Sequence, residues 1–424
     1  MQKTEQQDRV LIISNNVLSE TRSNGKTVLS YVDCLPKSMV KQLYFSAEKP
    51  SIAGYEYFQL SDKDVLHGIV SRKKRGRVVR ATETIETLTA QKPAIQNRTD
   101  FFRQVREWIW WKKWKSPQLL QWLDEYKPTA VFFVGGDCCF AYEICRFIVK
   151  RYNARLSLYI TDEYVMPRKK KSIIGAHRRK AITKQIRKTL ALSSAFFTVS
   201  NPMKTTYREV FGYDSDLIVN LTESLKDDGE QKEENAPITL SYIGSIYYGR
   251  GGVLAQIAET IRKYNLQTDG KKALLKVFTV QQPSQEESAK IFLDGASEYG
   301  GGLSREGVKN QLNATDILVF VESFEESEIE KTKFSLSTKV SEYMSVGKPI
   351  FAVGPQQVGS MEYLQDVALC VNAPTDIQEN LERLLQSNAL QEEYATKAYD
   401  KYVKNHNKTT IQKDFIAKIF GKEM

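Results

Sequence analysis

The sequence has few cysteines and no long apolar run, and each shortage excludes a class of protein. The 424 residues include five cysteines, an odd number without the paired spacing of a zinc site, so we expect free thiols in the cytosol. No uninterrupted apolar run reaches the roughly 18 residues that a membrane-spanning helix needs. The first eight residues are polar and acidic, so we expect no signal peptide.

Positive charge is concentrated in the first half of the chain. Up to Leu225 there are 38 Lys and Arg against 22 Asp and Glu, a net charge of +16, although the whole chain carries only +10. The remainder is therefore acidic, with a net charge of −6. A basic half joined to an acidic half predicts different partners for the two halves.

Alternating apolar strands and helices predict an α/β protein of two doubly wound domains. In the first half we expect strands at 9–14, 130–135, 156–161 and 195–200, with helices at 25–35 and 139–151. In the second half we expect strands at 238–243, 274–280, 317–321 and 349–353, with helices at 253–264, 285–294, 304–313 and 338–345.

The acidic, polar stretch at 226–237 has the composition of a linker. It separates an expected first domain at 1–225 from a second at 238–405. The tail at 406–424 carries apolar residues spaced four apart, and we expect it to be a helix that packs back on the first domain. These residues are Ile411, Phe415 and Ile419.

A glycine-rich loop follows the first predicted strand of the second half. The strand at 238–243 runs into 244–252, which contains Gly244, Gly251 and Arg250. Glycines allow a backbone to approach a phosphate closely, and a guanidinium offers a charged fork to its oxygens. A plain tight turn explains the loop equally well when it is taken alone.

The segment at 338–350 is the most informative in the chain. It predicts a short helix that carries Lys339 and Glu342 and stops at Gly347. The unpaired N–H groups at the start of such a helix favour a phosphate. Glu342 lies one turn in, where its carboxylate can accept two hydrogen bonds from a sugar diol.

The order and spacing of these segments resemble the GT-B glycosyltransferases, especially the retaining family 4. In that register Gly244 and Gly251 match the family's loop, Arg250 takes the place of a lysine and Ser245 replaces an arginine. The resemblance implies the GT-B fold, in which two Rossmann-like doubly wound domains face each other across a cleft. The first domain would bind the acceptor and the second would bind a nucleotide sugar.

Further donor-binding residues are implied by the same resemblance. Glu342 matches the second glutamate of the family's Glu-x7-Glu element, whose first position is Phe334 here. Lys339 would supply a second cation for the diphosphate. The loop near the nucleotide base and the start of the short helix would contribute Tyr299, Gly300, Ser337 and Thr338.

The first domain offers weaker candidates. Gly25 and Lys26 follow the first strand, in a loop that is not a P-loop because Glu20 stands where the motif requires glycine. The resemblance to GT-B proteins implies that this loop faces the donor phosphates. Asp162 and Glu163 follow another strand and are the best carboxylates for positioning an acceptor. The family often has a His-Asp pair there, which Asp162 fits, while Thr161 replaces the histidine. A plain turn and a helix cap are the structural alternatives for these two sites.

Glycosyl transfer breaks a sugar–phosphate bond, so negative charge builds on the leaving diphosphate. Arg250 and Lys339 would stabilise that charge without a metal or a cofactor. In the retaining reaction that the resemblance implies, a donor phosphate oxygen takes the acceptor proton. The Asp-x-Asp triplets at 62–64 and 214–216 lack the context of a metal site and are interpreted as chance.

All five tryptophans lie between Trp108 and Trp122, mostly interleaved with lysines at 108–115. Together with basic runs at 72–77 and 168–171, and with Arg178, Arg179 and Lys180, they favour docking on an anionic membrane surface. Core packing is the alternative for the tryptophans. Nucleic-acid binding is the alternative for the basic runs, but no nucleic-acid motif is present, so we expect no such partner.

The sequence therefore predicts a GT-B hexosyl- or glycosyltransferase on the cytoplasmic face of a membrane. It would move a sugar from a nucleotide sugar to a glycan or lipid-linked acceptor during cell-surface polysaccharide synthesis. Two alternatives stay open. One is a sugar-nucleotide epimerase of the same fold, and the other is a non-catalytic partner subunit, which the departures at Ser245 and Phe334 would suit.

Overall fold

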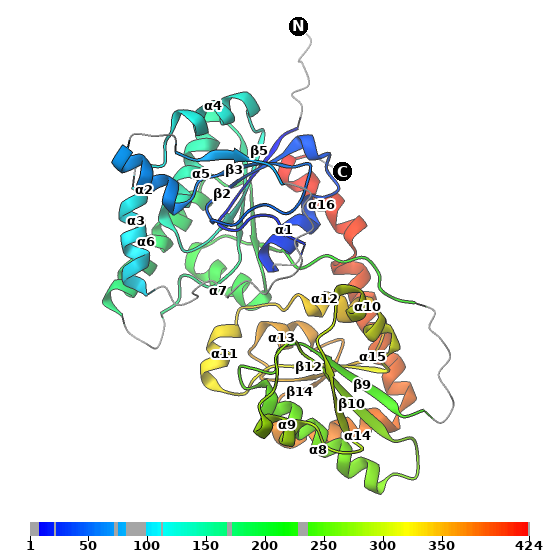
Figure 1. Cartoon of the computed structure of the whole chain (residues 1–424). Helices are drawn as coiled ribbons and strands as arrows, with labels where there is room; N and C mark the ends of the chain where they lie inside the picture. The colour runs from blue at the N-terminus through cyan, green and yellow to red at the C-terminus, as the bar shows by residue number, and fades with distance from the viewer. Residues whose placement is uncertain are drawn as a thin grey trace. The chain divides into compact units, whose positions relative to one another are not determined.

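The computed structural model divides the chain into two units (Figure 1). Unit 1 comprises Met1–Val199, Met203–Ile218 and Thr410–Met424, and unit 2 comprises Ser200–Pro202 and Val219–Thr409. The structure describes residues 8–20, 23–71, 75–81, 99–111, 113–167, 172–227 and 236–422. Most of the expected linker, 228–235, and the basic run at 168–171 lie outside these described residues.

Unit 1 is built on one sheet with the strand order β4-β3-β2-β1-β5-β6-β7-β8. Every neighbouring pair is parallel except β3 with β4. The inner strands are largely buried, as expected for a parallel sheet with helices on both faces, whereas the edge strands β4 and β8 are partly exposed. Their bounds are β1 (Val10–Ser14), β2 (Val40–Tyr44), β3 (Glu56–Gln59), β4 (Arg77–Val79), β5 (Ala130–Gly135), β6 (Arg155–Ile160), β7 (Ala195–Thr198) and β8 (Asp216–Leu217).

The described helices of unit 1 include α16 (Lys408–Phe420), which comes from the C-terminal end of the chain. The rings of Tyr31, Phe132 and Phe197 lie 4.8, 5.1 and 5.7 Å from the ring of Phe415, which α16 contributes. The helices are α1 (Ser23–Val32), α2 (Asp62–Ser71), α3 (Asp100–Trp110), α4 (Pro117–Tyr126), α5 (Cys139–Tyr152), α6 (Ile173–Leu190), α7 (Asn201–Phe211) and α16 (Lys408–Phe420), with a 3₁₀ turn η1 (Lys37–Met39).

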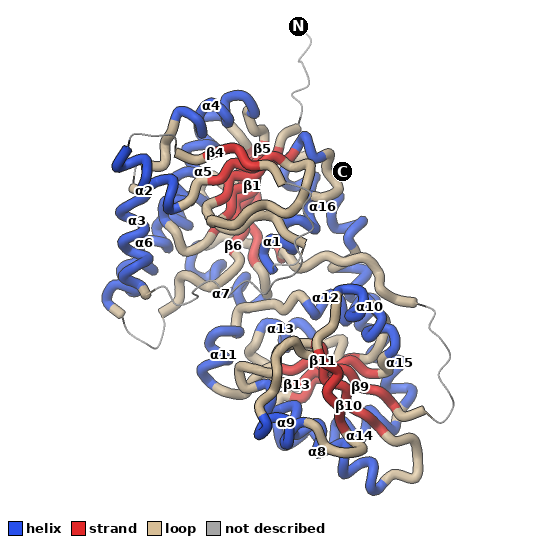
Figure 2. The backbone as a smooth tube through the Cα atoms, in the orientation of Figure 1, coloured by secondary structure: helices blue, strands red, loops and turns tan. Residues whose placement is uncertain are grey.

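Unit 2 has a second parallel sheet with the strand order β11-β10-β9-β12-β13-β14. Its strands lie at the centre of the unit with helices around them (Figure 2). Their bounds are β9 (Ile238–Ile243), β10 (Ala273–Phe278), β11 (Ser297–Gly301), β12 (Ile317–Val321), β13 (Ile350–Val353) and β14 (Leu369–Val371).

The described helices of unit 2 surround this sheet (Figure 2), and some of them contribute residues to its apolar core. They are α8 (Arg250–Gln267), α9 (Gln285–Ile291), α10 (Arg305–Ala314), α11 (Glu326–Thr332), α12 (Lys339–Ser345), α13 (Gly359–Leu364), α14 (Ile377–Gln386) and α15 (Asn388–Asn405), with a 3₁₀ turn η2 (Pro374–Asp376). The prediction of two doubly wound α/β domains is confirmed. Among the described residues, no helix is long and apolar enough to cross a bilayer.

Candidate functional site

The strand order of unit 2 fixes where a ligand is expected. The chain adds β10 and β11 on one side of β9 and then continues with β12 on the other side. Such a reversal leaves a crevice outside the carboxyl ends of the two central strands. Gly244 directly follows β9 and Glu322 directly follows β12, so both lie at this switch point.

Gly244 makes room for the ammonium group of Lys339. A β-carbon on Gly244 would lie 1.9 Å from Lys339 Nζ and 3.2 Å from the Tyr242 hydroxyl. The same ammonium lies 5.4 Å from the centre of the Tyr242 ring. The end of β9 and the start of α12, 95 residues apart in sequence, therefore meet at one cation.

Replacing Gly244 with alanine is expected to displace this ammonium without unfolding unit 2. The clash falls on the far end of a flexible side chain, so the melting temperature should change little. The rate of any reaction that needs Lys339 should fall about 10-fold or more, since a displaced donor loses most of its transition-state contact. Steady-state kinetics and thermal melts measure both effects.

Gly252→Ala is the matched control, because a β-carbon there meets no atom within 4 Å. It lies in the first turn of α8 and should leave the rate unchanged. Equal effects of the two substitutions would show that the loop, and not the ammonium, is disturbed.

Arg250 is held by the residue that follows β12. Its Nη2 lies 2.7 Å from Glu322 Oε2, and its Nε donates to the Val321 carbonyl at 3.2 Å. The Arg250 side chain is 18% exposed and the Glu322 side chain only 5%. A buried carboxylate thus fixes the Arg250 guanidinium at the carboxyl ends of the two central strands.

The pKa of Lys339 is lowered to about 8. Burial is the largest cause, followed by the positive charge of Arg250, while Glu322 and Glu342 act in the opposite direction. Two cations held near each other in a partly buried place favour an anion between them. An arriving phosphate would raise this pKa again.

Glu342 lies in the first turn of α12 and is partly exposed. The adjacent Tyr343 is buried and its hydroxyl accepts the N–H of Ile243 at 3.2 Å, which fixes the helix against the end of β9. Ser337 and Thr338 directly precede the helix. The Ser337 N–H donates to Ser360 Oγ at 3.0 Å, so this N–H already has a hydrogen-bond partner within unit 2. The roles of these residues toward a ligand remain predictions.

The expectation that Tyr299 and Gly300 form a loop is wrong. They belong to β11, which pairs with β10 at the edge of the sheet. A β-carbon on Gly300 would lie 2.2 Å from the Phe278 ring, so this glycine serves packing. Tyr299 is 41% exposed, and its hydroxyl lies 3.4 Å from the Gln281 carbonyl.

The loop after β9 has its own internal contacts. The Ser245 carbonyl accepts a hydrogen bond from the Tyr242 hydroxyl at 2.6 Å. The Ser245 Oγ accepts a second one from the Tyr247 N–H at 3.3 Å. The Gly251 N–H donates to the Ile246 carbonyl at 2.9 Å. A β-carbon on Gly251 would meet only ordinary contacts, so its match to the family loop has no steric reason in this chain.

Sequence reasoning missed the carboxylates after β12. Glu322 pairs with Arg250, and Gly249 adopts a φ of 75° with its α-carbon against Ser323 and Glu325. A β-carbon on Gly249 would lie 2.2 Å from Ser323 Oγ. The signal was present as an acidic segment directly after a buried strand, at the same edge of the sheet as the glycine loop.

Unit 1 has its own switch point between β1 and β5. A cavity of about 130 Å³ lies there, lined among others by Asn15, Gly25, Asp137 and Thr161. A β-carbon on Gly25 would come 2.6 Å from the Val17 carbonyl, so only glycine fits. Lys26, the next residue, is partly buried and is not among the cavity's lining residues.

Asp162 does not line this cavity. It is exposed, and its Oδ1 accepts the Glu163 N–H at 2.8 Å. Residues 161–167 form a loop and the next helix is capped by Ser172, so the alternative of a helix-capping Asp162 is wrong. The carboxylate that sequence reasoning missed is Asp137, which lines both this cavity and a neighbouring one of about 280 Å³. Its Oδ2 lies 3.2 Å from Arg103 Nη1.

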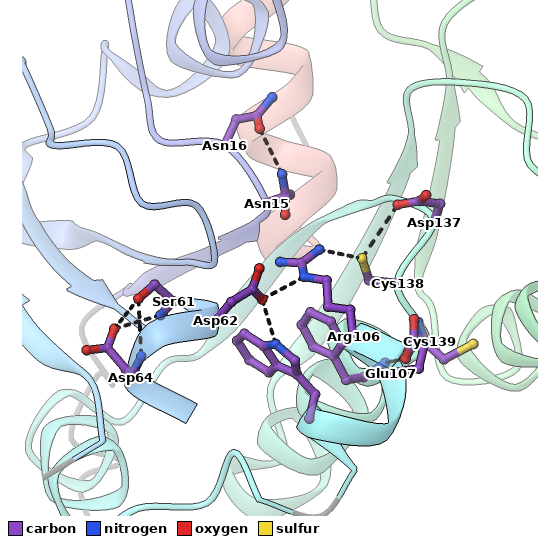
Figure 3. Close-up of polar contacts among 12 residues, drawn as sticks. Asn15, Asn16, Ser61, Asp62, Asp64, Arg106, Glu107, Asp137, Cys138 and Cys139 are labelled. Carbon is purple, nitrogen blue, oxygen red and sulfur yellow. Dashed lines mark hydrogen bonds and ion pairs between the residues drawn. The ribbon is translucent and has the colours of Figure 1, made fainter. Parts of the chain in front are cut away.

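The tryptophans divide into core and surface residues, so the prediction that they act together at a membrane needs correction. Trp110, Trp114 and Trp122 are buried, whereas Trp108 and Trp111 are each 62% exposed. Trp110 stacks on a phenylalanine ring, and its Nε1 donates to Asp62 at 2.8 Å. Figure 3 shows the hydrogen bond from Arg106 to the same Asp62 carboxylate.

The carboxylates of both Asp-x-Asp triplets make contacts within the protein. Asp64 accepts the Ser61 N–H at 2.8 Å, and Asp216 pairs with Lys418 at 2.6 Å. Among the described residues, no group of three or more His, Cys, Asp and Glu side chains is placed to hold a metal ion.

No protein-family model matches the sequence. A comparison with curated protein sequences also finds no match.

Solved structures share the fold along the whole chain. A trehalose-6-phosphate protein from E. coli bound with UDP-2-fluoro glucose is 13% identical, covers 98% of this chain and 99% of its own, and has a TM-score of 0.61. A UDP-forming α,α-trehalose-phosphate synthase from Burkholderia xenovorans in complex with glucose-6-phosphate is 12% identical over 97% and 100%, with a TM-score of 0.58.

A third structure is the apo form of the lipopolysaccharide outer core galactosyltransferase WaaB, 12% identical over 98% and 100%, with a TM-score of 0.57. At these identities the likeness concerns the fold alone. The chain therefore has the GT-B fold, as its resemblance to that class implied.

Proposed function

We propose that this chain is a GT-B glycosyltransferase that transfers a sugar from a nucleotide sugar. The observation that carries the proposal is the meeting of Gly244, Arg250 and Lys339 at the switch point of unit 2. Solved proteins of the same fold support it, since one is bound with UDP-2-fluoro glucose and another is a galactosyltransferase.

The donor diphosphate would lie against the glycine loop after β9. Arg250 and Lys339 would neutralise the charge that develops as the sugar–phosphate bond breaks. Glu342 would accept the hydroxyls of the ribose. Ser245, Gly251, Ser337 and Thr338 are the remaining donor-binding proposals close to these residues in sequence.

The finer parts of the proposal rest on the family resemblance. The reaction would retain the anomeric configuration, need no metal or cofactor, and let a donor phosphate oxygen take the acceptor proton. Gly25 and Lys26 in unit 1 remain proposals for contacts with the donor phosphates, and Asp162 remains the proposal for positioning the acceptor. Asp137 joins Asp162 because it lines two cavities in unit 1.

The acceptor would be a glycan or a lipid-linked sugar used for cell-surface polysaccharide. The protein would work on the cytoplasmic face of an anionic membrane, where its basic first half supports binding. Free thiols at all five cysteines suit that reducing compartment.

A thermal-shift screen against a panel of sugar nucleotides tests the proposal. A ligand at 100 times its Kd stabilises the native state by about 2.7 kcal/mol, so the right donor should raise the melting temperature by several degrees. If no sugar nucleotide shifts the melt, the donor site is refuted. An isomerised sugar nucleotide formed without acceptor would favour the epimerase, and binding without any transfer would favour the partner subunit.

A further inference from the structure

Helix α3 of unit 1 turns Trp110, Arg106 and Glu107 toward the protein, whereas the aromatic side chains on its other side face solvent. Surface helices of globular domains normally keep their apolar residues on the inward side. The outward residues are each more than half exposed: Phe101 at 55%, Phe102 at 63% and Trp108 at 62%. Trp111, which caps the helix, is 62% exposed as well.

The inward side of α3 is held by specific polar contacts, so this orientation is fixed. Arg106 Nε donates to Asp62 at 2.7 Å. Glu107 accepts the N–H groups of Cys139 and Phe140 at 2.7 and 3.2 Å and so caps the start of α5. Figure 3 shows both α3 side chains directed at these partners. Rotating α3 to hide its aromatic rings would break all of these bonds.

The neighbouring helix α6 supplies positive charge. The two helices contact each other and run side by side in unit 1 (Figure 1). α6 contains no acidic residue. Its first turn exposes Ile173, and the same helical face continues with exposed basic side chains at His177, Lys180, Lys184, Arg187 and Lys188.

We propose that the α3–α6 surface docks on the headgroup layer of an anionic lipid bilayer. Aromatic rings on a helix face suit the boundary between headgroups and acyl chains, and adjacent lysines suit the lipid phosphates. The positive charge of α6, which no acidic residue of that helix offsets, favours an anionic bilayer over an apolar protein partner. The inference rests on the proposed function, whose acceptor would be presented at that bilayer.

Binding to vesicles tests the surface with the full-length protein. Co-sedimentation with phosphatidylglycerol vesicles at low salt should be strong and should fall with zwitterionic lipid or with high salt. Phe102→Ser and Trp108→Ser should each weaken the vesicle affinity about tenfold, since each removes a ring from the apolar layer. Lys180→Ala and Lys184→Ala should each weaken it about fivefold.

Leu266→Ser is the matched control, because Leu266 is 76% exposed in unit 2 and should not contribute. Blue-shifted tryptophan emission on vesicle addition is expected from the native protein and not from Trp108→Phe/Trp111→Phe. Failure of the native protein to bind anionic vesicles would overturn the proposal. So would equal losses in the α3 variants and the control, or an α3 variant that changes only the oligomeric state.

The two proposals can fail separately. Donor binding in solution needs no vesicle, so a protein that binds a sugar nucleotide but no vesicle would refute only the docking surface. A protein that binds vesicles through α3 but no sugar nucleotide would refute only the transfer reaction.

Discussion

Replacing Arg250 with alanine is expected to lower the transfer rate by about 10²–10³-fold, the usual effect of one lost donor at a developing oxyanion. The guanidinium lies at the switch point of unit 2, where Glu322 holds it at 2.7 Å. The loss should appear mainly in kcat, since the charge on the diphosphate grows as the bond breaks.

Arg250→Ala should also lower the stability of the fold, so a double variant is needed to separate the loss of stability from the loss of rate. Without Arg250, the Glu322 carboxylate is buried without its cation, and breaking such a pair typically destabilises by about 3–5 kcal/mol. Arg250→Met combined with Glu322→Gln removes both charges and should restore much of the melting temperature while the rate stays low. A double variant with native stability and a near-native rate would contradict the role of Arg250.

A control lies in the same helix. Arg262 pairs with Glu259 at 2.8 Å on the exposed side of α8. Arg262→Ala should change the stability by less than about 0.5 kcal/mol and leave the rate unchanged. Comparing the two arginines separates the loss of a specific contact from the loss of a positive charge on α8.

Lys339→Met is expected to lower the transfer rate by a similar factor of about 10²–10³ while stabilising the fold at pH 7. Burial first, and then Arg250, lower the pKa of Lys339 to about 8 from 10.5, so its protonated form is unfavourable in the native state. Methionine fills comparable space without the charge. The gain should be on the order of 1–3 kcal/mol.

The sign of this effect can be checked with pH. Below about pH 8 the native protein holds the unfavourable charge, so the gain from methionine is complete. As the pH rises from about 8 to 10.5, native Lys339 loses its proton and the gain should disappear. Melting curves at pH 7 and 10 measure this, with the exposed Lys290→Met as a control that should show no gain. A destabilised Lys339→Met with a normal rate would contradict the account.

Much of the fold could be predicted from the sequence because strand and helix patterns alternate. The buried runs at β5 and β12 are continuous apolar segments, and Gly347 follows α12 as expected. β11 was not predicted, since Ser297–Gly301 is a short, glycine-containing edge strand without an apolar run. Its pairing with β10 is a tertiary property.

Only part of the candidate donor site could be predicted from the sequence. Gly244 and Lys339 stand out as turn and helix-start residues, but Glu322 gains its role only through a guanidinium 72 positions earlier in the chain. Asp162 and Asp137 both follow parallel strands, so the sequence could not decide which one lines a cavity. That choice depends on loop geometry, which turns Asp162 onto its own neighbour.

The tryptophan segment shows a further limit of pattern reading. Pattern reading would ordinarily assign the aromatic residues of α3 to the core, but only Trp110 among them is buried. Arg106 and Glu107 share its inward side, because Asp62 and the open N–H groups of α5 offer them partners inside the unit. Polar partners supplied by distant segments decided which face is buried.

Proton uptake on donor binding tests the central claim most directly, namely that the donor diphosphate contacts Lys339. The diphosphate of a sugar nucleotide does not titrate near pH 8, whereas about half of Lys339 is unprotonated there. Calorimetric titration at pH 8 in two buffers of different ionisation enthalpy should therefore show an uptake of about half a proton per site. The uptake should vanish in Lys339→Met. Binding without proton uptake, or the same uptake in the methionine variant, would contradict the account.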